Sequence, residues 1–251
     1  ICARFTPMIH QMFKNHRKTK LRRKWASLFG FTAAQTHTER HNELSYLAAL
    51  NEFKRCHDIN IPLYPFGAAA NSSLLYVVAR ALSSYSFDHV LELGCGQTSF
   101  LIDAIRKQFQ REFNVTSLEE NGFWQKQIQD QIDYSITHSD LTHQQINHRN
   151  VSFYSGLESH QQKRFDFILV DGPIGTPEYS RYGSLHFIEH NLADDFVIVF
   201  DDAHRLGELQ TVREALQLLD KKGHKYKVSQ LQALKHQVVI ASPKYEGACY
   251  F

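Results

Sequence analysis

The chain of 251 residues is poor in cysteine and methionine, and it has no apolar run long enough to cross a membrane. Its four cysteines, Cys2, Cys56, Cys95 and Cys249, stand far apart and form no CxxC pair. That spacing argues against a disulfide framework and against a cysteine-based zinc site. We therefore expect a reducing, cytoplasmic location, and a length that allows one α/β domain with a substantial core.

Acidic residues are missing from residues 1–38, which hold eight of the 28 Lys and Arg residues. The remainder of the chain carries the other 20 basic residues against all 26 acidic ones, a net charge of −6. The basic residues gather at 14–24. One interpretation is a contact with an anionic surface such as a membrane, and the other is a solvated helix face or a loose arm. Because nucleic-acid binding depends on neutralising phosphates, the acidic remainder disfavours a nucleic-acid partner.

Hydrophobic spacing predicts helices before residue 85 and an alternation of strands and helices after it. The first helix contains Leu44, Leu47, Leu50 and Phe53 at three-residue spacing, and a second is expected over Ser72–Leu82. The expected strands are Val90–Leu93, Val115–Leu118, Val151–Tyr154, Phe165–Val170 and Phe196–Phe200, with a closing hairpin of Tyr226–Val228 and Gln237–Ala241. Residues 133–150 are polar and are interpreted as a loop. This alternation predicts an α/β fold with a doubly wound, mostly parallel sheet.

The first of these strands ends in the sequence Glu92-Leu93-Gly94-Cys95-Gly96. Ligands of doubly wound sheets bind outside the carboxyl ends of the strands, where glycines let the backbone approach them closely. The stretch is not the dinucleotide pattern GxGxxG, because Ser99 stands where the third glycine would be. Glu92 would also repel a pyrophosphate, so a cationic ligand or a hydrogen-bond donor is favoured.

A second acid follows the next strand, at Glu119, with Glu120 as the alternative. A carboxylate at this strand end can accept hydrogen bonds from both ribose hydroxyls of a nucleoside. The separation of Glu119 from the glycines is about one helix and one strand, as a βαβ unit requires.

Together these residues resemble the S-adenosylmethionine (SAM) site of class I methyltransferases, and the resemblance covers about residues 60–242. It implies that Glu92, Gly94, Cys95 and Gly96 surround the amino-acid end of SAM and that Glu119 holds the ribose. Many members have a third glycine where this chain has Thr98. Further cofactor contacts are expected from Gly156, Leu157 and Asp171. The implied architecture is a seven-stranded sheet of order 3-2-1-4-5-7-6, in a Rossmann-like domain over 86–251 that follows a helical cap over 39–85 and the basic N-terminal extension over 1–38.

Three more acids follow the fourth and fifth strands: Asp171, Asp201 and Asp202. Adjacent parallel strands lie about 4.8 Å apart, so these carboxylates can converge. They would repel one another without a cation, and Mg²⁺ prefers oxygen ligands. The arrangement resembles metal-dependent small-molecule O-methyltransferases, several of which have Asn at the position of Asp202. The alternative is that one of these acids caps the following helix.

The function implied by this resemblance is O-methylation of a small polar hydroxyl acceptor, of sugar or polysaccharide type, with SAM and optionally Mg²⁺. Asp171, His204 or the metal would remove the hydroxyl proton. Arg181 and Arg205 are candidates for holding an anionic group of the acceptor, and the helices before residue 85 would cover the cofactor. The oligomeric state is open, and a homo-oligomer is one alternative.

Three other functions stay open from the sequence. One is an RNA or DNA methyltransferase that uses the basic arm, although Asp171-Gly172-Pro173-Ile174 stands where an amine-methylating Asn-Pro-Pro-Tyr motif would be. Another is a non-catalytic SAM-binding module that docks a partner enzyme. The third is a metal-dependent, hydroxylase-like relative with the same sheet.

Overall fold

The computed structural model describes residues 37–65, 67 and 69–251. The basic stretch 14–24, and with it the predicted anionic contact, lies outside the described residues. None of the described helices is long and apolar enough to span a bilayer.

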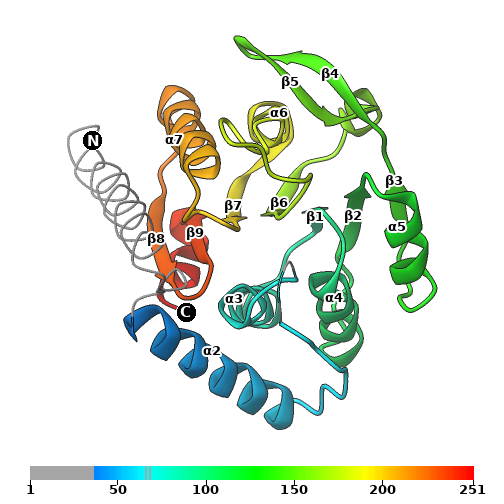
Figure 1. Ribbon diagram of the computed structural model, residues 1–251, viewed down its shortest axis with the longest axis vertical. Helices are drawn as coiled ribbons and strands as arrows, with labels where there is room; N and C mark the ends of the chain where they lie inside the picture. The colour runs from blue at the N-terminus through cyan, green and yellow to red at the C-terminus, as the bar shows by residue number, and fades with distance from the viewer. Residues whose placement is uncertain (1–36, 66, 68) are drawn as a thin grey trace, which may run out of the picture.

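A seven-stranded sheet forms the centre of the described chain (Figure 1). Its strands are β1 His89–Leu93, β2 Asn114–Glu119, β3 Ile136–His138, β6 Phe165–Val170, β7 Leu192–Phe200, β8 Lys227–Gln232 and β9 His236–Ala241. They lie in the order β3-β2-β1-β6-β7-β9-β8, which reads 3-2-1-4-5-7-6 when the seven are counted along the chain. The first five are parallel, and β9 runs antiparallel to both β7 and β8. The predicted fold class and strand order are confirmed.

The third strand was predicted in the wrong segment. Val151–Tyr154 lies in β5 (Arg149–Tyr154), which pairs with β4 (Leu141–Ile146) in a separate antiparallel hairpin that extends from the molecule in Figure 1. The strand beside β2 is Ile136–His138, inside the segment predicted as a loop. Only Ile136 of these three residues is buried, so the strand is too short and too polar to show an alternating pattern.

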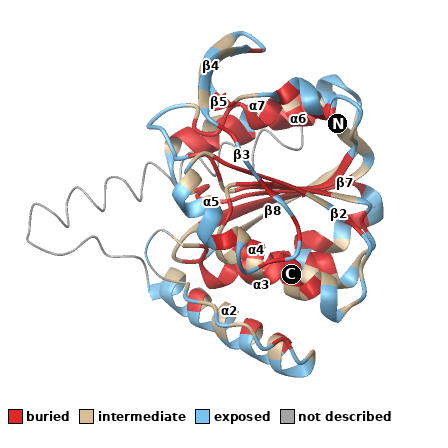
Figure 2. Ribbon diagram, turned by 90° about the vertical axis from the view of Figure 1, so that its right-hand side faces the viewer, coloured by how far each residue is buried: buried red, intermediate tan, exposed pale blue. Residues whose placement is uncertain are grey.

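Helices cover both faces of the sheet (Figure 2). One face carries α3 (Ser72–Ser84), α4 (Gln97–Gln108) and α5 (Gly122–Gln129), with α2 (His37–Cys56) outside them, and the other carries α6 (Ser184–His190) and α7 (Leu206–Lys221). Short 3₁₀ turns lie at Leu157–His160 and Pro243–Tyr250. Strand side chains alternate between the two cores: Phe167 belongs to the first and Ile168 to the second. Both faces are buried, which explains why the central strands are mostly apolar.

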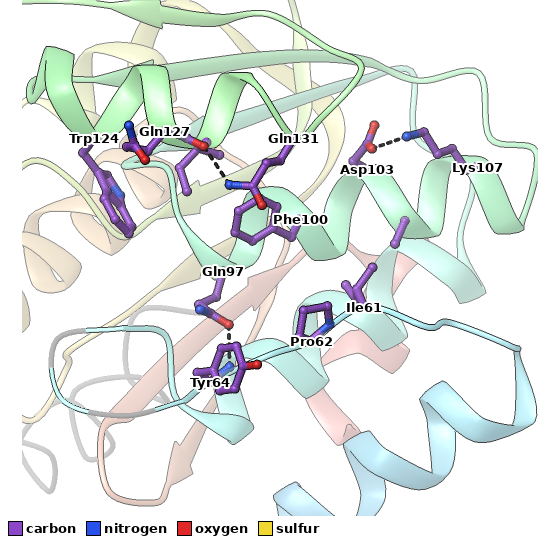
Figure 3. Close-up of a pocket in the computed structure, with 12 residues that line it drawn as sticks. Ile61, Pro62, Tyr64, Gln97, Phe100, Asp103, Lys107, Trp124, Gln127 and Gln131 are labelled. Carbon is purple, nitrogen blue, oxygen red and sulfur yellow. Dashed lines mark hydrogen bonds and ion pairs between the residues drawn. The ribbon is translucent and has the colours of Figure 1, made fainter.

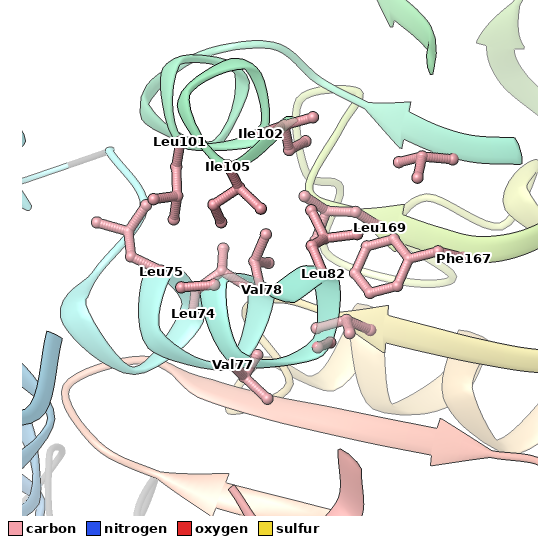
Figure 4. Packing of buried hydrophobic residues seen from close by; sticks show 14 of the residues in the cluster. Leu74, Leu75, Val77, Val78, Leu82, Leu101, Ile102, Ile105, Phe167 and Leu169 are labelled. Atoms are coloured by element: carbon pink, nitrogen blue, oxygen red, sulfur yellow. The ribbon is translucent and has the colours of Figure 1, made fainter. Parts of the chain in front are cut away.

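Helix α3 packs in the core on one face of the sheet, and the predicted cover over the cofactor stays a prediction. Leu74, Leu75, Val78 and Leu82 are fully buried, and Figure 4 shows them with α4 and Phe167. Each such leucine stabilises the fold by about 2–5 kcal/mol relative to alanine. Helix α2 packs outside α3 through Leu50 and Phe53. Leu44 points to solvent because a three-residue repeat drifts around a 3.6-residue helix.

Candidate active site

The glycine turn lies between the carboxyl end of β1 and the start of α4. Gly94 has a φ of +87°, and a Cβ there would lie 2.8 Å from the backbone nitrogen of Gly172. The backbone of the β1 turn therefore packs directly on that of the β6 turn. Gly96 is extended and precedes Gln97, the first residue of α4. The positive end of a helix at this point suits the carboxylate of an amino-acid ligand.

Glu92 holds this turn rather than facing a ligand as predicted. Its side chain is fully buried and accepts hydrogen bonds from the hydroxyls of Thr98 (2.7 Å), Ser99 (2.9 and 3.0 Å), Ser117 (2.7 Å) and Tyr134 (3.2 Å). Burial raises the pKa of Glu92, and these hydrogen bonds act in the opposite direction. Four donors from α4, β2 and the segment before β3 thus fix the end of β1. The direct contact between Glu92 and a ligand expected from the sequence is replaced by a structural role.

Glu119 lies against the glycine turn, as the βαβ spacing predicted. One of its oxygens accepts the backbone N–H of Cys95 (3.0 Å) and the other that of Asn121 (2.9 Å). Each carboxylate oxygen can accept a second hydrogen bond, so both remain able to hold a vicinal diol. Burial is the first cause of a raised pKa at Glu119, and the charge of Glu120 adds to it.

Glu120 points to another partner, the loop after β6. Its oxygens accept the Tyr154 hydroxyl (3.2 Å) and the backbone N–H of Ile174 (2.9 Å). The first contact joins the end of β2 to β5, and the second joins it to the loop after β6. Glu119 is therefore the better candidate for a ribose contact, since Glu120 is engaged in joining two loops.

Gly156 and Leu157 begin the 3₁₀ turn after the β4–β5 hairpin. Leu157 is buried in the second core, so only its backbone can contribute to a ligand site. Ser139 connects this turn to the ribose side: its backbone N–H donates to the Glu119 carbonyl (2.9 Å), and its hydroxyl donates to the Ser155 carbonyl (3.0 Å). The predicted cofactor contacts of Gly156 and Leu157 stay predictions.

The three acids of β6 and β7 converge. Asp171, Asp201 and Asp202 each present an oxygen within 4.8 Å of the others. Asp171 is 21% exposed at its side chain. Burial raises its pKa to about 8, with the charge of Asp201 as the next cause. Asp201 and Asp202 are almost fully buried, and within the described residues Asp201 Oδ2 and Asp202 Oδ1 have no hydrogen-bond partner.

Arg181 already supplies a positive charge to these acids. Its Nη2 lies 3.0 Å from Asp202 Oδ2 and 3.4 Å from Asp171 Oδ1, and its side chain is 6% exposed. The guanidinium also donates to the carbonyl oxygens of Pro173 (3.3 Å) and Asp201 (3.4 Å). Oxygen ligands of this kind suit Mg²⁺, but two of the three carboxylates are bound to Arg181. The predicted role of Arg181 in holding an anionic substrate is not supported, because its donors are directed into the protein.

A buried polar network, absent from the sequence prediction, holds Asp201. The side-chain amide of Gln237, on β9, donates to Asp201 Oδ1 (2.7 Å) and to Asn71 Oδ1 (3.0 Å). Its oxygen accepts the Ser73 hydroxyl (2.5 Å). Asn71 in turn donates to Glu43 of α2 (2.7 Å). Helices α2 and α3 are therefore connected to the acid cluster through hydrogen bonds.

His204 and Arg205 follow the acidic pair. Nδ1 of His204 accepts the backbone N–H of His236 at 3.4 Å, so a neutral ring carries its proton on Nε2. In that tautomer Nε2 is a donor, which does not suit the predicted role of a general base. Arg205 is 46% exposed at its side chain, and its Nη1 lies 3.0 Å from Asp202 Oδ2. It remains a candidate for contact with an acceptor.

A pocket of about 440 Å³ lies beside the glycine turn, between α4, α5 and the segment around Ile61 (Figure 3). Trp124 forms part of its wall, and the indole N–H donates to the Cys95 carbonyl (2.9 Å). Phe100 and Gln97 also line the pocket, and Gln97 accepts the backbone N–H of Tyr64 (2.7 Å). None of the three acids lines it, so it adjoins the cofactor side of the candidate site.

Comparison with known proteins supports the fold. No protein-family model and no curated protein sequence matches the chain. The chain resembles the SAH-bound structure of a methyltransferase from Podospora anserina, with a TM-score of 0.50 and 12% identity over 77% of this chain and 87% of that one. A precorrin-6y C5,15-methyltransferase from Geobacter metallireducens matches with a TM-score of 0.45 and 13% identity over 70% of this chain and 91% of that one. A SAM-dependent O-methyltransferase from Thermotoga maritima matches with a TM-score of 0.41 and 10% identity, over 77% and 71% of the two chains. The match to the Podospora structure, together with the strand order, shows that the chain has the fold of class I, Rossmann-like SAM-dependent methyltransferases.

Proposed function

We propose that the chain is a SAM-dependent methyltransferase that methylates a hydroxyl oxygen of a small polar acceptor, with a sugar-type acceptor preferred. The observation that carries this proposal is the convergence of Glu119 on the glycine turn, through its hydrogen bond to the Cys95 N–H. The Glu119 carboxylate can accept hydrogen bonds from a diol, which matches the ribose of SAM. The helix N-terminus beside it matches the carboxylate at the amino-acid end of SAM. The acids of β6 and β7 lie at the neighbouring strand ends, where an acceptor would approach.

The residues present fit SAM at the level of donor chemistry. Glu119 would hold the ribose hydroxyls, and the start of α4 would face the carboxylate. When bound, SAM would supply a sulfonium methyl group for in-line transfer to an oxygen nucleophile, with the thioether of SAH as the leaving group. The task of the protein is to align that oxygen and to exclude water.

Asp171 is the best candidate for the group that accepts the hydroxyl proton. It is the most exposed of the three acids, and a pKa of about 8 places its basicity near neutral pH, where general bases are most effective. Asp171 would take up the proton that the acceptor hydroxyl loses when its oxygen is methylated. Magnesium assistance is not required for this step, because Arg181 compensates part of the negative charge.

The proposal is tested by calorimetric titration with SAH, using NAD and ADP as controls. We expect SAH to bind and the dinucleotide not to bind, because the glycine turn lacks the dinucleotide pattern. A protein that binds SAH is then incubated with SAM and hydroxyl acceptors, and SAH release is measured. Binding of NAD without SAH would contradict the proposed cofactor. SAH binding without turnover on any hydroxyl would favour a non-catalytic binding module.

A further inference from the structure

The sequence led us to expect a metal cation among the three acids, and the structure has the positively charged side chain of Arg181 there. Nη2 of Arg181 lies between Asp202 (3.0 Å) and Asp171 (3.4 Å), and Nη1 contacts the Asp201 carbonyl. A single guanidinium thus touches a group from each of the three residues that would hold a metal. A divalent ion at the centre of this cluster would need the same carboxylates and would be repelled by the guanidinium.

The backbone holds Arg181 in this position. Tyr179 and Arg181 have φ values of +47° and +56°, in a backbone region that residues other than glycine rarely adopt. Ser180 between them is fixed from α7: its hydroxyl donates to Glu208 (2.9 Å), and its carbonyl accepts the Thr211 hydroxyl (2.6 Å). A turn held from both sides directs the guanidinium inward, so its placement is built into the fold.

The acids nevertheless keep capacity for an ion. Asp201 Oδ2 and Asp202 Oδ1 are buried oxygens without a hydrogen-bond partner among the described residues, and Lys235 Nζ approaches Asp201 Oδ2 only to 3.9 Å. Mg²⁺ binds carboxylate oxygens at about 2.0–2.1 Å, and Mn²⁺ prefers the same oxygen ligands. The donor set suits a divalent ion chemically, but Arg181 holds two of its carboxylates.

We propose that Arg181 and a divalent cation compete for the Asp171–Asp201–Asp202 cluster. While the Arg181 guanidinium is bound to the carboxylates, it takes the place of a metal ion. This proposal rests on the proposed function, because the three acids lie on the acceptor side of the same site. Arg181 would then govern whether the reaction depends on a metal.

The test is Mn²⁺ binding to the protein alone, measured by electron paramagnetic resonance of free Mn²⁺. We expect Arg181→Gln to bind Mn²⁺ at least tenfold more tightly than the wild type. The matched control is Arg205→Gln, which also removes a guanidinium 3.0 Å from Asp202 but from a side chain that is 46% exposed. We expect less than a threefold change in that variant. Adding Asp201→Asn to Arg181→Gln should abolish the gain.

An unchanged or weaker Mn²⁺ affinity in Arg181→Gln would overturn the proposal, as would an equal gain in Arg205→Gln. Because removing a buried cation from three acids destabilises the fold, thermal unfolding is measured as well. We expect Mn²⁺ to raise the unfolding temperature of Arg181→Gln more than that of the wild type. Should Arg181→Gln not fold, Arg181→Met removes the charge from a side chain of similar length and should likewise bind Mn²⁺ more tightly than the wild type. SAH titration in parallel reports on the proposed function, since SAH binding does not depend on the Mn²⁺ result.

Discussion

The contact between the two glycine turns makes a quantitative prediction for Gly94→Ala. A Cβ at Gly94 would lie 2.8 Å from the Gly172 nitrogen, 2.9 Å from its Cα and 3.1 Å from the Asp171 carbonyl carbon. Real Cβ atoms do not approach backbone this closely, so one turn must shift. Overpacking of this kind costs about 1–3 kcal/mol, and the φ of +87° adds about 1–2 kcal/mol for a residue with a side chain. We expect a total loss of about 2–5 kcal/mol in the free energy of unfolding.

Gly223→Ala is the matched control. Gly223 has a φ of +76°, but no atom lies within 4 Å of the position that a Cβ would take there. Gly223→Ala therefore introduces backbone strain but no steric clash. The effect of alanine on the unfolded chain is the same in both variants and cancels when they are compared. Urea unfolding followed by circular dichroism should place Gly94→Ala about 1–3 kcal/mol below Gly223→Ala. Equal losses in the two variants would refute the close approach of the two turns.

Gly96→Ala separates ligand blocking from folding. Gly96 is extended, and the nearest atom to a Cβ there is Trp124 Nε1 at 3.9 Å. We therefore expect stability close to that of the wild type but weaker SAH binding in calorimetry, because the added methyl group lies beside the proposed site. From the sequence, the glycines of this turn were expected to let a ligand approach the backbone closely. The structure places a Cβ at Gly94 against Gly172, so loss of binding there would follow from displaced turns.

Three further outcomes are expected. Glu119→Gln should lower SAH affinity at least tenfold in calorimetry, because hydrogen bonds to a charged group contribute about 1.5–3 kcal/mol; an unchanged affinity would remove Glu119 from the site. Asp171 has a folded-state pKa of about 8, above its unfolded value, so its contribution to stability is complete at low pH and is lost as pH rises from about 4 to about 8. Urea midpoints of Asp171→Asn should therefore fall less over that range than those of the wild type, and parallel curves would contradict the shifted pKa. Gln237→Leu should lose about 1–3 kcal/mol in urea unfolding by leaving buried partners unpaired, whereas Gln232→Leu, on an exposed side chain, should change stability by less than about 0.5 kcal/mol.

The alternation of strands and helices was predictable because the central strands are apolar and separated by helices, whereas the strand order came from the resemblance to class I methyltransferases. The six-residue run Phe165–Val170 is buried along its whole length. A near-continuous apolar run of this length is typical of a central strand in a parallel sheet. Ile136–His138 gave no such signal, since an edge strand of three residues is formed by its neighbour β2 rather than by its own pattern. The more apolar Val151–Tyr154 therefore took its place in the prediction.

The acids of the candidate site were predictable in position but not in function. Strand ends located Glu92, Glu119 and Asp171, because parallel strands bring their carboxyl ends to one edge. What each carboxylate binds depends on residues that are distant in the sequence. Tyr134 reaches Glu92 across 42 residues, and Gln237 reaches Asp201 across 36. Single polar residues of this kind carry no periodic signal, so the hydroxyl shell of Glu92 was missed.

The two halves of the site are joined through backbone, and this has a consequence for methyl transfer. In the proposed function, the cofactor would lie on β1 and β2, and the acceptor on β6 and β7. Between them, the backbone N–H groups of Asp171 (3.0 Å) and Gly172 (2.5 Å) both donate to the Leu93 carbonyl. Backbone atoms set this separation, so it cannot adapt by changing rotamers. Since displacement at a methyl carbon requires the acceptor oxygen about 3–3.5 Å away and in line, a rigid join of this kind would fix the distance between the proposed base Asp171 and the glycine turn before either ligand binds.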